Sequence, residues 1–380
     1  MTTFLQLHLL TSYPPACLNR DDLNRPKSAI MGGVPRLRIS SQSLKRAWRT
    51  SEQFEDALAG YMGTRTKRMG VQVFQNLSAA GVDERNAREW ARAIAGRFGK
   101  LKGAKPDNAL NDLEIEQLAH FSPEEERAIN ALADTLVQGR RVPTEAELAL
   151  LRKNHTAADI ALFGRMLTKA DDGQSLVEFG GEAACQVAHA ITVHRAAVED
   201  DFFTAVDDLN TREEDAGSAH MGEQGFGAGL FYLYVCIDCD LLRENLGSDE
   251  IAGKAIKALI EAAATVAPTG KQNSFASRAW AYYALAEKGS RQPRALSLAF
   301  MKPVREGDML GEAVTALTTM RDNLDKVYYG KDVDEKDEKT GKMEKRRVPD
   351  SLPDKQFNAL TGKGSFQELL TWAADFGSGA

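Results

Sequence analysis

The first 54 residues contain a strand, a long loop and a helix in succession, and this order constrains the fold most. Residues 2–13, TTFLQLHLLTSY, mix apolar and polar side chains as a partly buried β-strand does, and Pro14 and Pro15 are expected to end it. A polar loop with glycine and proline then extends to about residue 35, and a helix is predicted from about residue 41 to 54. A strand, loop and helix in this order form the first half of a βαβ unit.

Helical signals dominate the segment from about residue 57 to 156. Ser122–Glu125 and Thr144–Glu147 have the capping-box pattern, and each precedes an apolar-periodic run. Arg85–Phe98 is a third amphipathic stretch. This segment is therefore predicted to be a helical insertion into a sheet domain.

Strand-like segments return after the helical insertion. A helix is also expected at 249–265, and the dense mixture of charges at 329–347 is predicted to be a solvated loop. Two βαβ-like halves separated by inserts favour a ferredoxin-like α+β core. The predicted strands are 158–163, 183–193, 228–238 and 295–300.

Composition is typical of a soluble, cytoplasmic protein. The 380 residues are 43% apolar and 27% charged, which is ordinary for a globular protein with a large core. Four cysteines are too few for a disulfide scaffold in a chain this long, and no secretory segment precedes them, so a reducing cytoplasm is expected. The apolar runs are much shorter than the roughly 20 residues that cross a bilayer, so membrane insertion is not expected.

Charge is distributed unevenly along the chain. The formal net charge is −6, yet residues 19–50 contain eight cations and two acids, so this segment is at +6 and the remainder is at −12. Residues 199–215 alone hold eight acids and one arginine. A protein that is negative overall but has one dense basic segment is expected to bind a polyanion there and to repel it elsewhere.

The sequence RISSQSLKRAWRT at 38–50 concentrates positive charge on one side of the predicted helix. Four polar residues recur at i, i+3, i+4 and i+7, which places them in one stripe with apolar residues on the other side. Ser40 and Ser41 supply hydroxyl and free N–H groups at the helix start, where anions bind. A solvated basic face is the alternative interpretation. The stripe consists of Gln42, Lys45, Arg46 and Arg49, and the apolar side of Leu44, Ala47 and Trp48.

The loop before this helix adds further groups that bind phosphate. It supplies Asn19, Arg20, Arg25 and Lys27, and a strand–helix unit can fold this loop over the helix start. Guanidinium groups bind phosphate oxygens through two parallel bonds, and lysine contributes a point charge. Loop and helix would together hold several consecutive phosphates and read no base, which predicts nucleic-acid binding without sequence preference.

Other chemical motifs in the sequence are incomplete. Cys236 and Cys239 have CxxC spacing, but no second pair completes four zinc ligands, so no metal is expected. The run GFGAG at 225–229 lacks the third glycine of a dinucleotide loop and precedes a strand former, so no nucleotide cofactor is expected. The paired acids Asp21–Asp22 and Asp207–Asp208 leave a metal-dependent nuclease as an alternative.

Seven short motifs stand out along the chain: CLNRDD at 17–22, RISSQSLKRA at 38–47, GRM at 164–166, AHAIT at 188–192, FTAVDDL at 203–209, GSAH at 217–220 and ENLG at 244–247. In order and with their spacing kept, they closely resemble the CasC backbone-subunit family of the type I-E CRISPR surveillance complex, Cascade. The similarity extends from the first strand to at least the 240s. The helical insertion and the C-terminal third match less clearly.

The resemblance implies an α+β architecture shaped like a right hand. An RNA-recognition-like (ferredoxin-like) palm would carry a helical fingers insertion and a β-hairpin thumb. The implied boundaries are palm at 1–57, fingers at 58–156, palm again at 157–196, thumb at 197–224 and the C-terminal part of the palm at 225–380, with a charged loop at 330–347 that the family does not explain.

The resemblance also implies a non-enzymatic function. Several copies would polymerise along one CRISPR RNA (crRNA) guide and hold its phosphate backbone, and each thumb would fold over the neighbour's strand and flip out a base. The guide exposed between thumbs would then pair with target DNA, so that pairing reads sequence while protein reads backbone shape. The expected partners are the guide, neighbouring copies, target DNA through the guide and other Cascade subunits, without a cofactor or a membrane.

The family motifs assign roles to individual residues. Phe202 and Phe203 at the base of the thumb, and His220 and Met221 near its return, are candidates for wedging beside the displaced nucleotide. Packing between subunits is an equal interpretation of Phe202, and core filling is an equal interpretation of Met166. A ribonuclease that uses Asp21 or Asp22 stays an alternative. The predicted RNA-binding residues are Asn19, Arg20, Lys27, Ser40, Gln42, Lys45, Arg46, Arg49, Arg165 and Met166, with Lys271 and Gln272 as weaker candidates.

Overall fold

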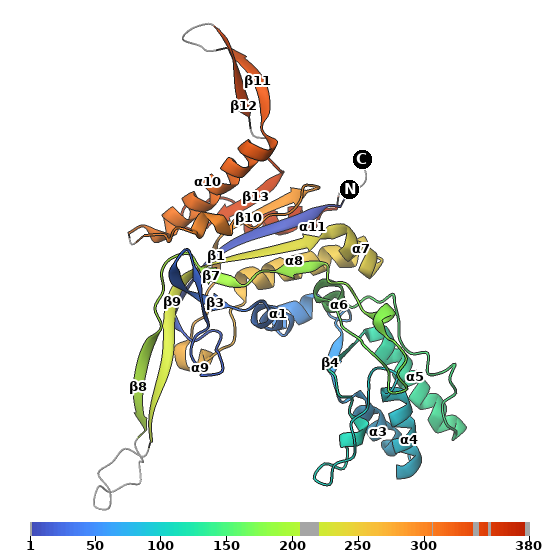
Figure 1. Ribbon diagram of the computed structural model, residues 1–380. Helices are drawn as coiled ribbons and strands as arrows, with labels where there is room; N and C mark the ends of the chain where they lie inside the picture. Colours follow the sequence, from blue (N-terminus) through green and yellow to red (C-terminus); the bar gives the residue numbers. More distant parts are fainter. Residues whose placement is uncertain (1, 206–219, 306, 337–341, 349–350, 377–380) are drawn as a thin grey trace, which may run out of the picture. The chain divides into compact units, whose positions relative to one another are not determined.

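The chain folds into two compact units, the first of which is built on an antiparallel β-sheet (Figure 1). The computed structural model describes residues 2–205, 220–305, 307–336, 342–348 and 351–376. Unit 1 comprises Met1–Ser51, Val187–Cys236 and Leu259–Asp375, and unit 2 comprises Glu52–Gln186, Ile237–Ala258 and Phe376–Ala380. Helices and antiparallel strands together make this an α+β protein, as the sequence predicts.

The sheet of unit 1 has the strand order β13–β10–β1–β9–β7–β3–β2, and β8 pairs with β9. Neighbours in this order lie far apart in the sequence: β1 pairs antiparallel with β10 from Phe4↔Gly289 to Thr11↔Ala281. The strands are β1 Phe4–Ala16, β2 Ser28–Met31, β3 Val34–Ile39, β7 Ala190–Thr192, β8 Glu199–Ala205, β9 His220–Asp238, β10 Ala281–Gly289, β11 Lys331–Lys336, β12 Met343–Val348 and β13 Asp354–Asn358. The last residues of β9 belong to unit 2.

Helices complete unit 1 around a core that joins distant segments. Leu10 of β1, Tyr232 of β9 and Tyr283 of β10 are buried in one cluster with Phe300 and Leu317. Burial of such side chains stabilises by about 1.5–3 kcal/mol each. The helical elements are α1 Ser41–Arg49, α9 Gln272–Phe275, the 3₁₀ turn η3 Ser297–Phe300, α10 Met309–Tyr329 and α11 Phe366–Ala374.

Unit 2 has its own apolar core and is mainly helical. Trp90 and Ile94 of α4, Leu77 of α3 and Leu136 of α5 are buried in one cluster. The predicted helical insertion at 58–156 falls inside this unit. Its elements are α2 Glu52–Ala57, β4 Thr64–Thr66, α3 Met69–Ala79, α4 Glu84–Ala95, η1 Asn111–Leu113, β5 Ala119–Phe121, α5 Pro123–Gly139, α6 Ala158–Phe163, η2 Val177–Phe179, β6 Cys185–Val187, which ends in unit 1, α7 Cys239–Leu246 and the first part of α8 Asp249–Thr265.

The first strand and the following loop differ from the prediction in two respects. β1 continues through Pro14 and Pro15 to Ala16, because its pairing with β10 ends at Thr11 and the prolines need not donate a bond on that side. The predicted loop contains the hairpin β2–β3. Gly32 and Gly33 form its two-residue turn with φ of 62° and 76°, values that a two-residue hairpin turn requires and that glycine adopts most easily.

The basic helix is shorter than predicted. α1 ends at Arg49, and a separate helix, α2, begins at Glu52. The hydroxyls of Thr50 and Ser51 donate to the carbonyls of Arg46 and Trp48 at 2.8 and 2.7 Å. Carbonyls at the end of the helix thus receive hydrogen bonds from the residues that follow it. Its buried side consists of Leu44, Ala47 and Trp48, as predicted.

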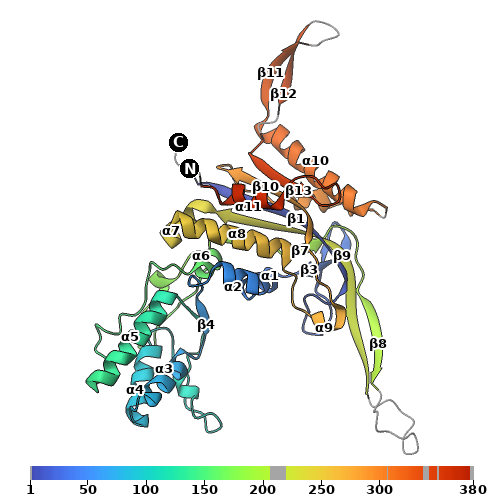
Figure 2. The same ribbon diagram turned by 180° about the vertical axis from the view of Figure 1, so that it is seen from behind.

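Three further segments contradict the predicted secondary structure. Residues 158–163 form helix α6 and residues 297–300 form a 3₁₀ turn. Both were predicted as strands, because the pattern of a short apolar run is the same in a buried strand and in a buried helix. The predicted loop at 329–347 contains the hairpin β11–β12, which continues from the end of α10 (Figure 2). Its register extends from Lys331↔Val348 to Lys336↔Met343.

The remaining sequence predictions agree with the structure to different degrees. Helix 249–265 is confirmed as α8, and strand 228–238 lies within β9. Segment 183–193 holds two short strands, β6 and β7, in place of one. Ser122 and Glu125 form the predicted capping box at the start of α5, whereas Thr144 and Glu147 exchange the same bonds without a helix following.

Candidate nucleic-acid interface

The start of α1 is fixed in place by its cap and by the preceding loop. Ser40 has extended backbone angles and its hydroxyl accepts the N–H of Ser43 at 3.3 Å. The N–H of Ser40 donates to the side-chain oxygen of Asn19 at 2.9 Å. Helix geometry leaves the N–H groups of Ser41 and Gln42 without acceptors inside the helix, so they can bind an anion. The hydroxyl oxygen of Ser40 accepts this cap bond, and its O–H group can still donate to the predicted phosphate.

The predicted polar stripe of α1 lies opposite its buried side. Gln42 and Arg46 are exposed, and Lys45 and Arg49 are half-buried. The first turn of α1 contains no acidic residue, and its last turn contains Arg46 and Arg49. The stripe and the helix N-terminus therefore present positive potential on one surface.

The loop at 19–27 is folded back to the helix by its own hydrogen bonds. The Oδ1 atom of Asp21 accepts the N–H groups of Leu23 and Arg25 at 3.0 and 2.9 Å. Arg20 donates to the side chain of Asn24 at 2.8 Å, and the N–H of Lys27 donates to the carbonyl of Asn19 at 2.8 Å. The structure therefore brings Asn19, Arg20 and Lys27 together with the start of α1, as the sequence predicts.

Of the two acids in this loop, Asp21 has a structural role. One of its carboxylate oxygens shapes the turn, whereas Asp22 is exposed. Among the described residues, no group of three or more His, Cys, Asp or Glu side chains is arranged to hold a metal ion. Cys236 and Cys239 are both buried.

The loop around Lys271 also lies against this region. A Cβ atom on Gly270 would come within 2.3 Å of the Leu18 carbonyl oxygen, so only glycine permits this close packing on the segment before Asn19. Lys271 has a positive φ of 52°, and its ammonium group donates to Gln224 at 3.0 Å. Gln272 donates to the carbonyl of Pro268 at 2.7 Å. Lys271 is thus near the predicted interface, while one donor of Gln272 is used within its own loop.

The predicted thumb begins as an antiparallel ribbon of β8 and the first part of β9 (Figure 1). Phe202 and Phe203 are 65% and 43% exposed. The register sets Thr204 opposite Met221 and Ala205 opposite His220. Residues 206–219, which complete the predicted thumb and include Asp207–Asp208, lie outside the described residues.

An ion pair that the sequence did not predict joins this ribbon to the loop at 19–27, which is called the basic loop below. Arg25 contacts Asp200 of β8 at 2.7 Å, and both side chains are about two-fifths exposed. A pair this exposed contributes about 0–1 kcal/mol and mainly fixes geometry. Arg25 is therefore engaged at the base of the ribbon.

Arg165 does not have the predicted role, which is a correction to the sequence analysis. Its side chain is 1% exposed and pairs with the buried Glu125 at 2.6 Å. The same guanidinium donates to the carbonyls of His120, Arg152 and Phe179. These internal bonds leave no surface for a phosphate, so Arg165 stabilises unit 2.

Met166, the next residue, is 75% exposed. The alternative that Met166 fills the core is therefore wrong. Its contact with a base stays a prediction, and the residue belongs to unit 2, separate from the unit that carries α1.

A family profile described as CT1975-like protein matches residues 5–369 of this chain. The chain belongs to the CT1975-like family. No curated protein matches this CT1975-like chain.

Two solved structures contain chains similar to this family member. A chain of a CRISPR RNA-guided surveillance complex, pre-nicking, aligns with a TM-score of 0.74 and 31% identity over 86% of this chain and 89% of its own length. A chain of another CRISPR RNA-guided surveillance complex aligns with a TM-score of 0.70 and 21% identity over 98% and 99% of the two chains. The second similarity concerns the fold alone.

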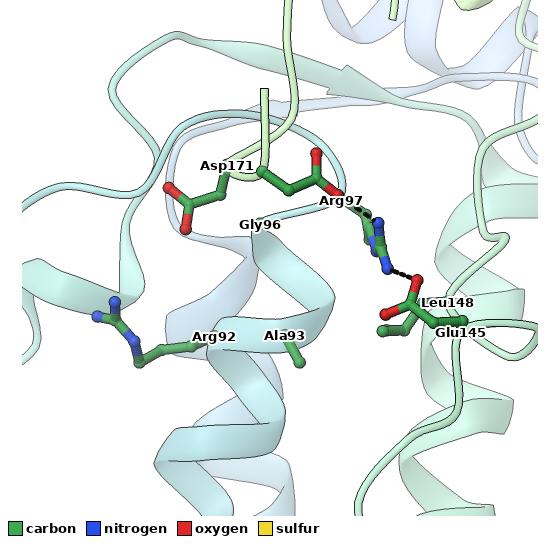
Figure 3. Close-up of a pocket in the computed structure, with 8 residues that line it drawn as sticks. Arg92, Ala93, Gly96, Arg97, Glu145, Leu148 and Asp171 are labelled. Carbon is green, nitrogen blue, oxygen red and sulfur yellow. Dashed lines mark hydrogen bonds and ion pairs between the residues drawn. The ribbon is translucent and has the colours of Figure 1, made fainter. Parts of the chain in front are cut away.

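Unit 2 of the CT1975-like chain has an open hollow of about 230 Å³ that is lined by arginines and acids (Figure 3). Arg97 pairs with Glu145 and with Asp172, and Arg92 donates to Asp112 at 3.0 Å. Because carboxylates already neutralise these cations, the hollow does not favour an anion.

None of the helices searched among the described residues is long and apolar enough to span a membrane.

Proposed function

We propose that this CT1975-like chain is a non-catalytic backbone subunit of a Cascade-type CRISPR surveillance complex, similar to CasC of type I-E. It would bind the phosphate backbone of a crRNA guide without sequence preference. The proposal is supported by the family membership, by the 31% identity to a chain of a CRISPR RNA-guided surveillance complex and by the motifs at the basic segment.

The observation that carries the proposal is the bond between Asn19 and Ser40. It holds the loop at 19–27 against the start of a helix whose first N–H groups can bind an anion and whose polar stripe is also basic. Preorganised N–H donors and cations bind phosphate oxygens, and such contacts carry no base information. The acidic remainder of the chain, at −12, would discourage the strand from binding elsewhere.

The proposed architecture assigns an RNA-recognition-like palm to unit 1 and helical fingers to part of unit 2. The ribbon of β8 and β9 would be the base of a thumb. In the proposed assembly, copies line up along one guide, and the exposed Phe202 and Phe203 wedge beside a displaced nucleotide. The guide between thumbs would pair with target DNA, alongside other Cascade subunits in the cytoplasm.

Purification from cells that also express a CRISPR array tests this function. RNA that copurifies with the tagged chain should be sequenced. The proposal expects one repeat sequence joined to many different spacers. A mixture that mirrors total cellular RNA, or no RNA, would contradict a guide-binding role.

The non-catalytic part of the proposal needs a separate assay. Assemblies with guide should be incubated with complementary RNA and Mg²⁺. The proposal expects intact target RNA. Cleavage at regular intervals that disappears in Asp22→Ala would instead favour the metal-dependent ribonuclease.

A further inference from the structure

Arg38 and His189 form a polar contact beside the start of α1. A guanidinium nitrogen of Arg38 lies 2.7 Å from Nδ1 of His189. Since a guanidinium only donates, Nδ1 accepts this bond and the neutral imidazole carries its proton on Nε2. His189 is exposed and Arg38 is half-buried, so both remain near solvent.

Strand pairing fixes the position of this contact. β3 pairs with β7 through Arg38↔Ile191 and Ile39↔Ala190. His189 directly precedes the paired residues of β7, and Ser40, the N-cap of α1, directly follows those of β3. The contact therefore lies next to the free N–H groups of the helix start.

Lys27 brings a second cation to the same place. Its carbonyl accepts the N–H of Arg38 at 2.8 Å, just before the β2–β3 pairing begins. The charged groups that act on the imidazole are Arg38 of β3 and Lys27 of the basic loop. Partial desolvation lowers the pKa of His189, and these two positive charges lower it further.

We propose that Lys27, Arg38 and His189 form an additional binding site for one phosphodiester of the guide, in which His189 positions the guanidinium of Arg38. This inference rests on the proposed function and adds two residues to its interface. In the free protein, the Nδ1 atom of neutral His189 accepts the bond from Arg38 and holds the guanidinium in place. When the imidazole takes up a proton, Nδ1 becomes a donor and this bond ends, so that the guanidinium and the imidazolium both donate to the phosphate. A phosphate that binds between the two cations also faces the imidazole.

Phosphate binding is then coupled to proton uptake from solvent. The negative charge of the phosphodiester favours the protonated imidazole, which raises the pKa of His189 above its value in the free protein. Because the complex binds more protons than the free protein, affinity rises as the pH falls through this range. A shift of one pKa unit corresponds to a change in affinity of up to about tenfold.

The test measures the affinity of the full chain for a mixed-sequence single-stranded RNA at pH 8 and pH 6, at fixed ionic strength. The wild type should bind more tightly at pH 6, and His189→Gln should lose much of that difference. Arg38→Ala should weaken binding at both pH values and lower the slope of log affinity against log salt by about 0.7. Arg38→Lys keeps the charge but loses the paired donors of the guanidinium, so its affinity should lie between that of the wild type and that of Arg38→Ala.

The control is Lys326→Ala, which removes one exposed cation from α10 of the same unit and should leave affinity and salt slope unchanged. If Arg38→Ala folds and binds RNA with the affinity and the salt slope of the wild type, the additional site is overturned. If Arg38→Ala does not fold, wild-type affinity of Arg38→Lys overturns the site instead. A pH effect that persists undiminished in His189→Gln overturns the role of His189. If the wild type binds no single-stranded RNA at either pH, the proposed function fails as well, and that result is distinct from the other two.

Discussion

The side-chain oxygen of Asn19 accepts the backbone N–H of Ser40 at 2.9 Å, and this bond joins the basic loop to the first residue of the α1 cap. The two residues are 21 positions apart, with the β2–β3 hairpin between them. The bond therefore sets the distance between the phosphate-binding groups of the loop and those of the helix. Its removal should affect both stability and RNA binding.

Two substitutions of Asn19 separate these effects. Asn19→Ala leaves the buried N–H of Ser40 without its acceptor and should lower the free energy of unfolding by about 1–3 kcal/mol. Asn19→Asp keeps an acceptor and should retain stability, but its negative charge should weaken RNA binding. Chemical denaturation and RNA titration measure the two effects. Binding by Asn19→Asp at wild-type strength would contradict a phosphate near this position.

The stripe of α1 predicts a change in salt dependence. Lys45→Ala combined with Arg49→Ala should weaken binding to all guide sequences alike, because phosphate contacts carry no sequence information. The slope of log affinity against log salt should fall by about 1.4, from about 0.7 per phosphate contact on a single strand. Titrations at several salt concentrations with unrelated RNAs check this. Loss of binding for only some sequences would indicate base contacts instead.

Arg165 predicts a large effect on stability. Arg165→Ala leaves the buried carboxylate of Glu125 without its partner and should destabilise the protein by about 3–5 kcal/mol. Arg141→Ala, which breaks the exposed pair with Glu147, is the matched control and should cost no more than about 1 kcal/mol. Thermal unfolding of both variants measures the difference. Equal melting temperatures would rule out the structural role of Arg165.

His8 predicts acid sensitivity of the protein. Its imidazole is fully buried and lies 2.9 Å from the hydroxyl of Tyr232, and burial lowers its pKa below the ordinary 6.5. Below about pH 6.5, His8 therefore binds a proton in the unfolded chain before it does so in the native state. The free energy of unfolding should fall as the pH drops below this value. Denaturation at pH 7.5, 6.5 and 5.5 measures this decline.

Substitution of His8 shows how much of this loss of stability at low pH is due to its imidazole. His8→Gln should flatten part of the pH dependence, whatever its effect on stability at pH 7.5. His155 should account for another part, because burial and the charge of Arg165 also lower its pKa. An unchanged slope in His8→Gln would show that this imidazole does not titrate on unfolding.

Local patterns predicted the start and the two sides of the basic helix, although not its end at Arg49, because the relevant interactions are close in sequence. The cap at Ser40, the buried side with Trp48 and the polar stripe all depend on residues within one short helix. The strand in β9 and helix α8 were similarly clear, since both have long, consistent patterns. The turn at Gly32–Gly33 also carried a signal, two glycines between short strands, that the sequence analysis did not use.

Interactions between distant residues account for the parts that the sequence could not predict. Arg165 lies in a motif associated with RNA, but its partner Glu125 is 40 positions away and only the fold brings them together. Arg38 was counted as one of eight cations, and its contact with His189 spans 151 positions. The short apolar run of α6 was ambiguous because its burial on all sides removes periodicity.

The most direct test of sequence-independent phosphate binding is a salt titration of the purified chain with several single-stranded RNAs of equal length and unrelated sequence. Sequence-independent binding requires affinities that are equal within about threefold and the same linear salt slope for every RNA, and the double variant Lys45→Ala, Arg49→Ala should lower both the affinity and the slope in parallel. Affinities that differ by orders of magnitude between sequences, or a slope that the double variant leaves unchanged, would contradict it.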